Sequence, residues 1–163
     1  MIAAFMVAAS FGAMLVHQRI ADIEKWMVLF ALLFAGSGYI GLALSNGYLS
    51  WIPNSWLSGL WLTCTVVFIT AAIMTYHPYF GYFGKKDIRL WLSMIGLFVL
   101  TGALVNVWFS TLITFLLLIV MFGVGLIAGF FIQNHLYVQW ARINWLPYVP
   151  LLFLVFATAG KLL

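Results

Sequence analysis

The sequence predicts an all-α membrane protein, in which residues 1–163 form a single bundle of six helices that cross the bilayer. Two features predict this fold class: 66% of the 163 residues are hydrophobic, and only 6% are charged. A soluble domain carries about 25% charged and about 45–50% apolar residues. The composition therefore excludes a soluble globular protein, and also a disordered chain, a disulfide-linked scaffold and a nucleic-acid-binding protein.

The predicted spans follow from the lengths of the apolar stretches. A spanning helix needs about 20 apolar residues to cross about 30 Å of hydrocarbon, and six stretches approach this length, the first being a little short. The uncharged region from Leu90 to Ile132 is too long for one span, so we place a break at Asn106–Trp108, its polar and interfacial cluster. The predicted spans are residues 2–16, 26–44, 57–76, 90–107, 109–132 and 145–163.

The charged residues predict how these spans are oriented. Lys and Arg concentrate in the cytoplasmic loops of membrane proteins. With six spans, every basic residue except Lys161 falls on one side, and all three acidic residues join them. A five-span alternative with one long tilted helix would put Arg142 on the opposite side. We therefore expect a multi-pass protein of a cell inner membrane with both termini outside, the cytoplasmic basic residues being Arg19, Lys25, Lys85, Lys86, Arg89 and Arg142.

Trp residues and small residues support this arrangement. Trp side chains favour the headgroup level, so Trp51, Trp56 and Trp61 are predicted to mark the outer boundary. Small residues let helices approach closely in lipid, and they recur at helical spacing in three of the spans. The predicted contact faces comprise Ala4, Ala8 and Gly12 in the first span, Gly36, Ser37, Gly38 and Gly41 in the second, and Gly125 and Gly129 in the fifth.

Three histidines occupy equivalent places in the predicted topology. His17, His77 and His135 lie at the cytoplasmic ends of the first, third and fifth spans, and each following span opens near a Trp. This order is consistent with three repeated helical hairpins. It is equally consistent with the polar and Trp residues that any membrane hairpin carries at this interface.

These histidines are also the candidates for ionisable chemistry. No Asp, Glu, Lys or Arg lies in the middle of a predicted span, which argues against a proton- or sodium-coupled transporter and against enzymes that need intramembrane acids. If the three spans adjoin, two imidazoles would ligate a haem iron, or all three would bind copper or zinc. The alternative is that His17, His77 and His135 each meet water and lipid headgroups.

A second set of candidates consists of uncharged polar residues near or within the spans. Such groups line a path for a small neutral solute, but Ser and Thr also bond the carbonyl four residues back in their own helix, and a terminal Asn caps a helix. The candidate path residues are Ser37, Thr63, Thr70, Asn46 and Asn106.

Three functional hypotheses therefore remain. The first is a channel or small transport component for a neutral or weakly ionised solute. The second is a structural or accessory subunit of a membrane complex, in contact with a partner protein or a second copy through the aromatic and basic loop 78–86. The third is a redox protein that binds haem or copper through its histidines. With lipid as the surrounding partner and no catalytic motif in the chain, the sequence favours a role other than catalysis.

Overall fold

A computed structural model describes residues 2–16, 23–47, 51–78, 80–83, 87–105, 111–140 and 145–162, with side chains as far as residue 160. Within these ranges the chain is helical apart from turns and one isolated β-bridge between His77 and Gly81. This confirms the all-α fold class. The elements are α1 (Ile2–Leu15), α2 (Ile23–Asn46), α3 (Asn54–Thr75), α4 (Ile88–Ala103), α5 (Thr111–Trp140), the 3₁₀ helix η1 (Leu146–Tyr148) and α6 (Val149–Leu162).

The helices fall into two length classes. Helices α2, α3 and α5 have 24, 22 and 30 residues and are long and apolar enough to cross a membrane. Helices α1, α4 and α6 are also apolar but have only 14, 16 and 14 residues. At about 1.5 Å per residue, the short helices reach only about 21–24 Å. By length and composition, three helices of the described chain are therefore candidates to span a bilayer.

The long apolar region from residue 90 to residue 132 divides where the sequence predicts. Helix α4 ends at Ala103 and α5 begins at Thr111, and Asn106 lies between them, outside the described residues. Helix α5, however, continues to Trp140, well beyond the predicted end at Ile132. The polar residues after Ile132 suggested a boundary, but they include no Gly or Pro, and polarity by itself does not end a helix.

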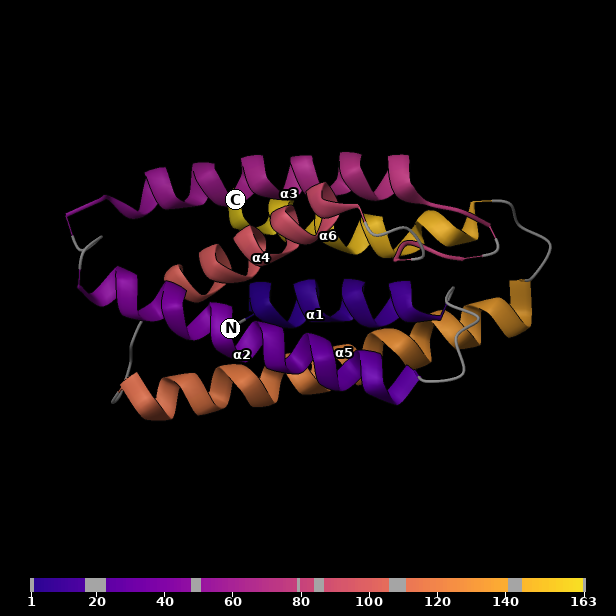
Figure 1. The fold of residues 1–163 in the computed structure, drawn as a ribbon, viewed down its shortest axis with the longest axis horizontal. Coiled ribbons are helices and arrows are strands. Elements are labelled where there is room, and N and C mark those ends of the chain that lie inside the picture. The colour runs from indigo at the N-terminus through magenta and orange to yellow at the C-terminus, as the bar shows by residue number, and fades with distance from the viewer. Residues whose placement is uncertain are drawn as a thin grey trace.

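Consecutive helices run in alternating directions along the long axis of the molecule, with α1 in the middle (Figure 1). Helix α1 packs mainly against α5 and α6, whereas α4 packs against both α2 and α3. Every residue of α1 from Val7 to Leu15 is buried. The first helix of the chain is therefore the interior helix of the bundle.

Glycines allow the closest helix contacts. A Cβ atom added at Gly12 in α1 would collide with the backbone of Leu126 in α5, and one added at Gly41 in α2 would collide with the backbone of Val99 in α4. These collisions confirm Gly12 and Gly41 as predicted contact positions. Gly36 differs, because a Cβ there would meet nothing within 4 Å.

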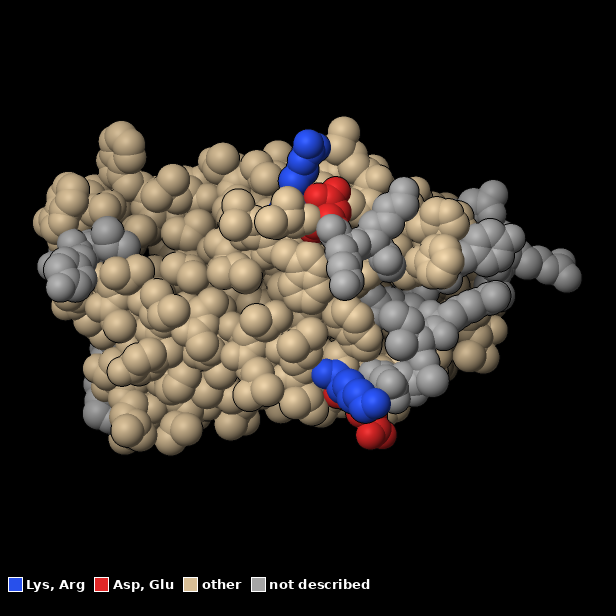
Figure 2. Space-filling model, viewed as in Figure 1, with Lys and Arg blue, Asp and Glu red and all other residues tan. Residues whose placement is uncertain are grey.

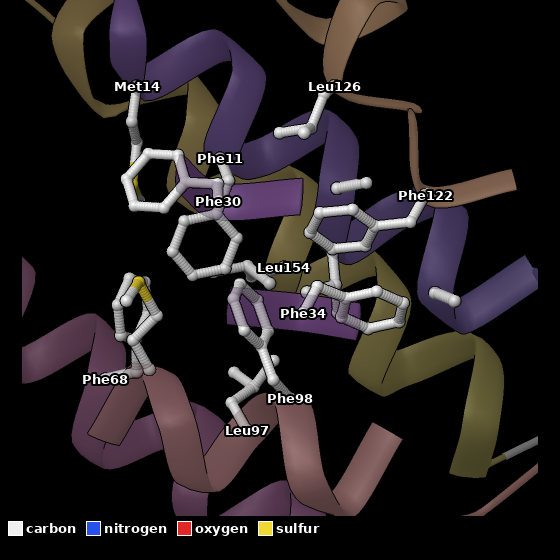
Figure 3. Close-up of a cluster of buried hydrophobic side chains, with 14 of the residues drawn as sticks. Phe11, Met14, Phe30, Phe34, Phe68, Leu97, Phe98, Phe122, Leu126 and Leu154 are labelled. Carbon is white, nitrogen blue, oxygen red and sulfur yellow. The ribbon is translucent and has the colours of Figure 1, made fainter. Parts of the chain in front are cut away.

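Phenylalanine rings fill the centre of the bundle, where they point toward one another (Figure 3). The rings of Phe34 and Phe122 stack with their centroids 3.8 Å apart and an interplanar angle of 5°. Phe98 meets both of them edge to face, at 5.3 Å from each, and Phe11 lies 5.0 Å from Phe98. Phe68 of α3 lies 5.0 Å from Phe11, so side chains from five helices interlock through aromatic contacts, and Leu154 of α6 completes the cluster.

One expected boundary residue lies in the core instead. Trp61 is only 1% exposed, and its indole Nε1 donates a 3.0 Å hydrogen bond to Thr101 Oγ1. A buried indole needs an acceptor for its N–H, and the neighbouring helix α4 supplies one. Trp61 therefore packs inside the bundle and does not face lipid headgroups, while Trp51 and Trp56 are exposed; the depth of all three in a membrane stays a prediction.

Candidate functional site

The structure describes two of the three candidate histidines. His77 follows α3 and is half-buried, with its ring 5.3 Å from that of Phe80. His135 is exposed on α5, where its Nε2 lies 2.9 Å from Nε2 of Gln139. His17 falls outside the described residues. Among the residues that the structure describes, no three His, Cys, Asp or Glu side chains gather as a metal site, so convergence of the three imidazoles stays a prediction.

The candidate path residues occupy separate parts of the bundle. Ser37 is buried in α2, where its hydroxyl donates to Leu33 O. Thr63 and Thr70 are exposed on α3 and donate to the carbonyls of Gly59 and Val66 in the turn before each. The alternative role of these hydroxyls, bonding within their own helix, is thereby confirmed.

The structure describes one of the two candidate asparagines. Asn46 is exposed at the end of α2, and Asn106 lies outside the described residues. Ser37 is therefore the one candidate path residue that the structure places in the interior of the described bundle. A solute path through these residues stays a prediction.

A different polar cluster emerges at the end of the bundle where α3 and α5 finish and α6 begins (Figure 1). Tyr82, in the connection between α3 and α4, donates a hydrogen bond from its hydroxyl to Pro147 O in η1. Gln133 of α5 donates from Nε2 to the neighbouring carbonyl, Leu146 O, at 2.9 Å. We call Tyr76, Tyr82, Gln133 and Tyr148 the Tyr–Gln cluster.

A tight turn brings Tyr82 into this cluster. The backbone N–H and C=O of His77 both bond those of Gly81, at 3.0 and 2.8 Å. Gly81 has φ of 67°, in the left-handed region that glycine adopts without the steric cost of a Cβ atom. The turn reverses the chain so that Tyr82 and Phe83 are both buried in the end of the bundle.

Prolines explain why η1 needs partners from elsewhere in the chain. In a continuous α-helix, the Leu146 carbonyl would accept the backbone N–H of residue 150. Residue 150 is proline and has no N–H, so the carbonyl accepts from Val149, one residue earlier, in the tighter 3₁₀ turn. The Gln133 amide supplies a second donor to this carbonyl.

The phenols of Tyr76 and Tyr82 stay protonated at neutral pH. The rings of Tyr76 and Tyr82 are 4.9 Å apart, and those of Tyr76 and Tyr148 are 5.6 Å apart. Burial, and then the charges that Tyr76 and Tyr148 would carry if ionised, raise the pKa of Tyr82 well above its usual range. Burial likewise raises the pKa of Tyr76, with a further contribution from Tyr148. The cluster therefore offers neutral hydrogen-bonding groups.

Sequence reasoning did not identify this cluster. Tyr76 lies at the end of the predicted span 57–76, Tyr82 in the loop 78–86 and Gln133 just after the predicted span 109–132, and none was a candidate site residue. The available signals were the two prolines at 147 and 150, which predict unpaired carbonyls, and the Gly81–Tyr82 pair inside an aromatic loop. Neither identifies the donor that meets those carbonyls, because Tyr82 and Gln133 lie far from them in sequence.

Comparison with known proteins finds no match among protein-family models, curated proteins or solved structures. Function must therefore be inferred from the chain itself.

Proposed function

We propose that this chain is an integral membrane protein whose six helices all cross the bilayer, and that it serves as a structural or accessory subunit of a membrane complex. The outer surface supports the membrane part of the proposal. Large apolar side chains are exposed along the long helices, including Leu112 at 67% and Met74 at 79%. A soluble monomer rarely exposes contiguous apolar patches beyond a few hundred Å², whereas lipid tails cover such faces without cost.

The charged side chains support the proposed orientation. Glu24 and Lys25 lie at the start of α2, and Asp87 and Arg89 lie at the start of α4. Figure 2 shows described charged side chains in two groups at a similar level along the long axis, while the rest of the visible described surface is uncharged. By the positive-inside tendency, this level would face the cytoplasm of a cell whose inner membrane holds the protein.

The alternating helix directions support six crossings despite the three short helices. Helices α1, α4 and α6 run alongside α2, α3 and α5 (Figure 1), and most of α1 is enclosed by protein. A helix surrounded by protein needs no full-length apolar surface of its own, because its neighbours meet the lipid. On this ground we count α1 as a crossing, and we count α4 and α6 by their alternating directions, since both expose apolar side chains such as Leu92 and Phe156.

The observation that carries the subunit role is the placement of small and polar residues on the outside of α3. Gly59, Thr63 and Thr70 are exposed, and their spacings of four and seven residues put them on one helix face. A Cβ at Gly59 would meet nothing within 4 Å. Small and hydroxyl-bearing residues on a membrane helix favour contact with another helix, while the interior of the bundle is filled by aromatic rings.

The proposed topology is tested by thiol labelling. In a Cys64→Ala background, Asn54→Cys should react with a membrane-impermeant thiol reagent added outside intact cells. Glu24→Cys should react only after the membrane is permeabilised, because α2 would separate the two positions. Labelling of both variants from the same side would contradict a crossing by α2, and the reverse pattern would contradict the orientation.

The subunit role is tested by photocrosslinking in the native membrane. A photoreactive residue in place of Thr63 should give a discrete adduct with a second protein. The matched control is the same residue at Leu117, on the exposed face of α5, where adducts with lipid alone are expected. Lipid adducts alone at position 63 would contradict the proposal, and an adduct with a second copy of the chain would identify a homo-oligomer instead.

The channel and redox hypotheses stay predictions with tests of their own. A haem absorption band in the purified protein, lost in His77→Ala or His135→Ala, would support the redox hypothesis over the subunit role. Solute flux through the purified protein would support the channel hypothesis.

A further inference from the structure

The two halves of the chain make the same set of helix contacts. Helix α1 packs mainly against α5 and α6, and α4 packs mainly against α2 and α3. Exchanging α1 with α4, α2 with α5 and α3 with α6 therefore maps one set of contacts onto the other. In each half the second helix is also the longest. The unit that recurs is three helices long, from α1 to α3 and from α4 to α6.

The close glycine contacts recur residue by residue. A Cβ atom added at Gly12 of α1 would collide with the Leu126 carbonyl of α5, and one added at Gly102 of α4 would collide with the Gly38 carbonyl of α2. Gly102 follows Gly12 by 90 residues, and Leu126 follows Gly38 by 88. The same contact therefore joins the first helix of each half to the second helix of the other half.

A second pair of contacts has the same two spacings. A Cβ atom added at Gly129 of α5 would collide with the Ala9 carbonyl of α1, and one added at Gly41 of α2 would collide with the Val99 carbonyl of α4. Val99 follows Ala9 by 90 residues, and Gly129 follows Gly41 by 88. Two separate contacts thus give one alignment of the two halves.

This alignment identifies a two-fold axis. Phe34 of α2 corresponds to Phe122 of α5, and these two rings stack on each other in the aromatic centre (Figure 3). A residue that contacts its own equivalent lies on a two-fold axis. The Trp-Ile-Pro of residues 51–53, before α3, is likewise matched by the Trp-Leu-Pro of residues 145–147, before the main part of α6. Consecutive helices alternate in direction (Figure 1), so a unit of three helices is inverted relative to the next.

We infer that α1–α3 and α4–α6 are inverted repeats that have exchanged their first helices, and that the two resulting bodies move against each other. One body comprises α2, α3 and α4, and the other comprises α1, α5 and α6. Within each body the backbones meet at glycines, and such close packing fixes the helices of a body to one another. The inference does not depend on the proposed subunit role.

The seam between the two bodies is made differently. Phe11 lies 5.0 Å from both Phe68 and Phe98 across the seam, and ring contacts of this kind are favourable over a range of centroid separations, about 4.5–7 Å. At one end of the seam, the Tyr82 hydroxyl donates to Pro147 O and so joins the α3–α4 connection of one body to η1 of the other. Inverted repeats in membrane proteins commonly rock against each other as rigid bodies, and here the Tyr82 bond would hold one end closed.

Distances between spin labels, measured by pulsed electron paramagnetic resonance on the full-length protein in lipid, test the movement. In a Cys64→Ala background, labels at Leu92 and Leu152 report across the seam, and labels at Val28 and Leu92 report within one body. All three positions are exposed. Tyr82→Phe removes the hydrogen bond across the seam. We expect it to broaden the Leu92–Leu152 distance distribution and to leave the Val28–Leu92 distribution unchanged.

Two further variants complete this experiment. Tyr148→Phe is the matched control and should change neither distribution. Phe122→Leu removes a stacked ring on the axis and should broaden only the distribution across the seam, which keeps the test available if Tyr82→Phe does not fold. An unchanged Leu92–Leu152 distribution in both Tyr82→Phe and Phe122→Leu, or equal broadening of both label pairs, overturns the movement.

The inversion of the repeats has a test of its own. Trp51 and Trp145 are equivalent in the two units, and both are exposed. In the Cys64→Ala background, Trp51→Cys and Trp145→Cys should react with a membrane-impermeant thiol reagent from opposite sides of the membrane. Reaction from the same side overturns the inversion, whatever the crosslinking result at Thr63. Lipid adducts alone at position 63 would contradict the subunit role and leave the repeats unaffected.

Discussion

Tyr82 is a fully buried phenol whose only polar atom bonds a carbonyl on another connection of the bundle. Tyr82→Phe keeps the ring in place but leaves Pro147 O without this donor. We expect the free energy of unfolding to fall by about 1–2 kcal/mol, the usual cost of losing one buried hydrogen-bond partner. Reversible denaturation in detergent measures the change. Tyr148→Phe is the matched control, because Tyr148 is exposed and its variant should differ little from wild type.

The raised pKa of Tyr82 predicts how stability depends on alkaline pH. A free phenol ionises near pH 10, and burial raises the pKa of Tyr82 in the folded protein. Above about pH 10 the unfolded chain therefore releases this proton while the folded protein retains it, which favours unfolding. We expect the stability of wild type to decline above about pH 10 more steeply than that of Tyr82→Phe. Parallel slopes for the two proteins would contradict this role of Tyr82.

At the residue level, sequence reasoning succeeded where chemistry is local. The bonds from Thr63 and Thr70 to their own helix follow from the geometry of any helix, and the alternative role given to them was correct. Trp61 and Gln133 depend on what lies across the bundle, Thr101 in the first case and Leu146 in the second. Such pairings cannot be read from one helix at a time.

At the level of helices, substitution of Gly41 tests the packing of α2 on α4, and the same substitution at Gly36, also on α2, is its control. Gly41→Ala should destabilise the protein by about 1–3 kcal/mol, the usual range for forcing extra atoms into a packed core, because the new methyl group would meet the Val99 backbone. Gly36→Ala should be neutral or stabilising, since its position is open and alanine favours a helix by about 1 kcal/mol over glycine. Thermal unfolding of both variants in detergent checks the contrast, and equal effects would contradict the packing of α2 on α4.

The ends of the helices were predictable only where the backbone itself changes. The break between α4 and α5 was correctly placed around Asn106 because an uninterrupted apolar stretch of that length does not fit one span. The end of α5 was misplaced because a polar surface resembles a helix end in sequence. Proline gives a stricter boundary: Pro147 and Pro150 explain why α6 begins at Val149, after a 3₁₀ turn, rather than at the predicted Trp145.

At the level of the whole molecule, the aromatic packing at the centre of the bundle predicts that the protein alone does not make a lipid bilayer permeable to small neutral solutes. The aromatic cluster of Phe11, Phe34, Phe98 and Phe122 lies where a central path would run. We expect liposomes that contain the purified protein to admit a neutral solute such as glycerol no faster than protein-free liposomes. Stopped-flow light scattering measures this rate. A faster rate that scales with protein content would contradict the subunit role and favour a channel.

Charge and apolar length predicted the helical class of the molecule, and the described residues form six α-helices, as many as the predicted spans. They did not predict which helix would be interior. All the helices are apolar, so hydrophobicity does not distinguish α1 from α5. Small residues at Gly12, Gly125 and Gly129 indicated close contacts, but the pairing of α1 with α5 depends on the folded arrangement.

The enclosure of α1 has a consequence for how the protein is made. During synthesis α1 is made well before its main neighbours, α5 and α6. Ala9 and Gly129 are in contact, although 119 residues lie between them in the sequence. The close-packing face of α1 therefore lacks its native partners until α5 and α6 have been synthesised. Assembly of the bundle cannot be complete before α6 has been translated.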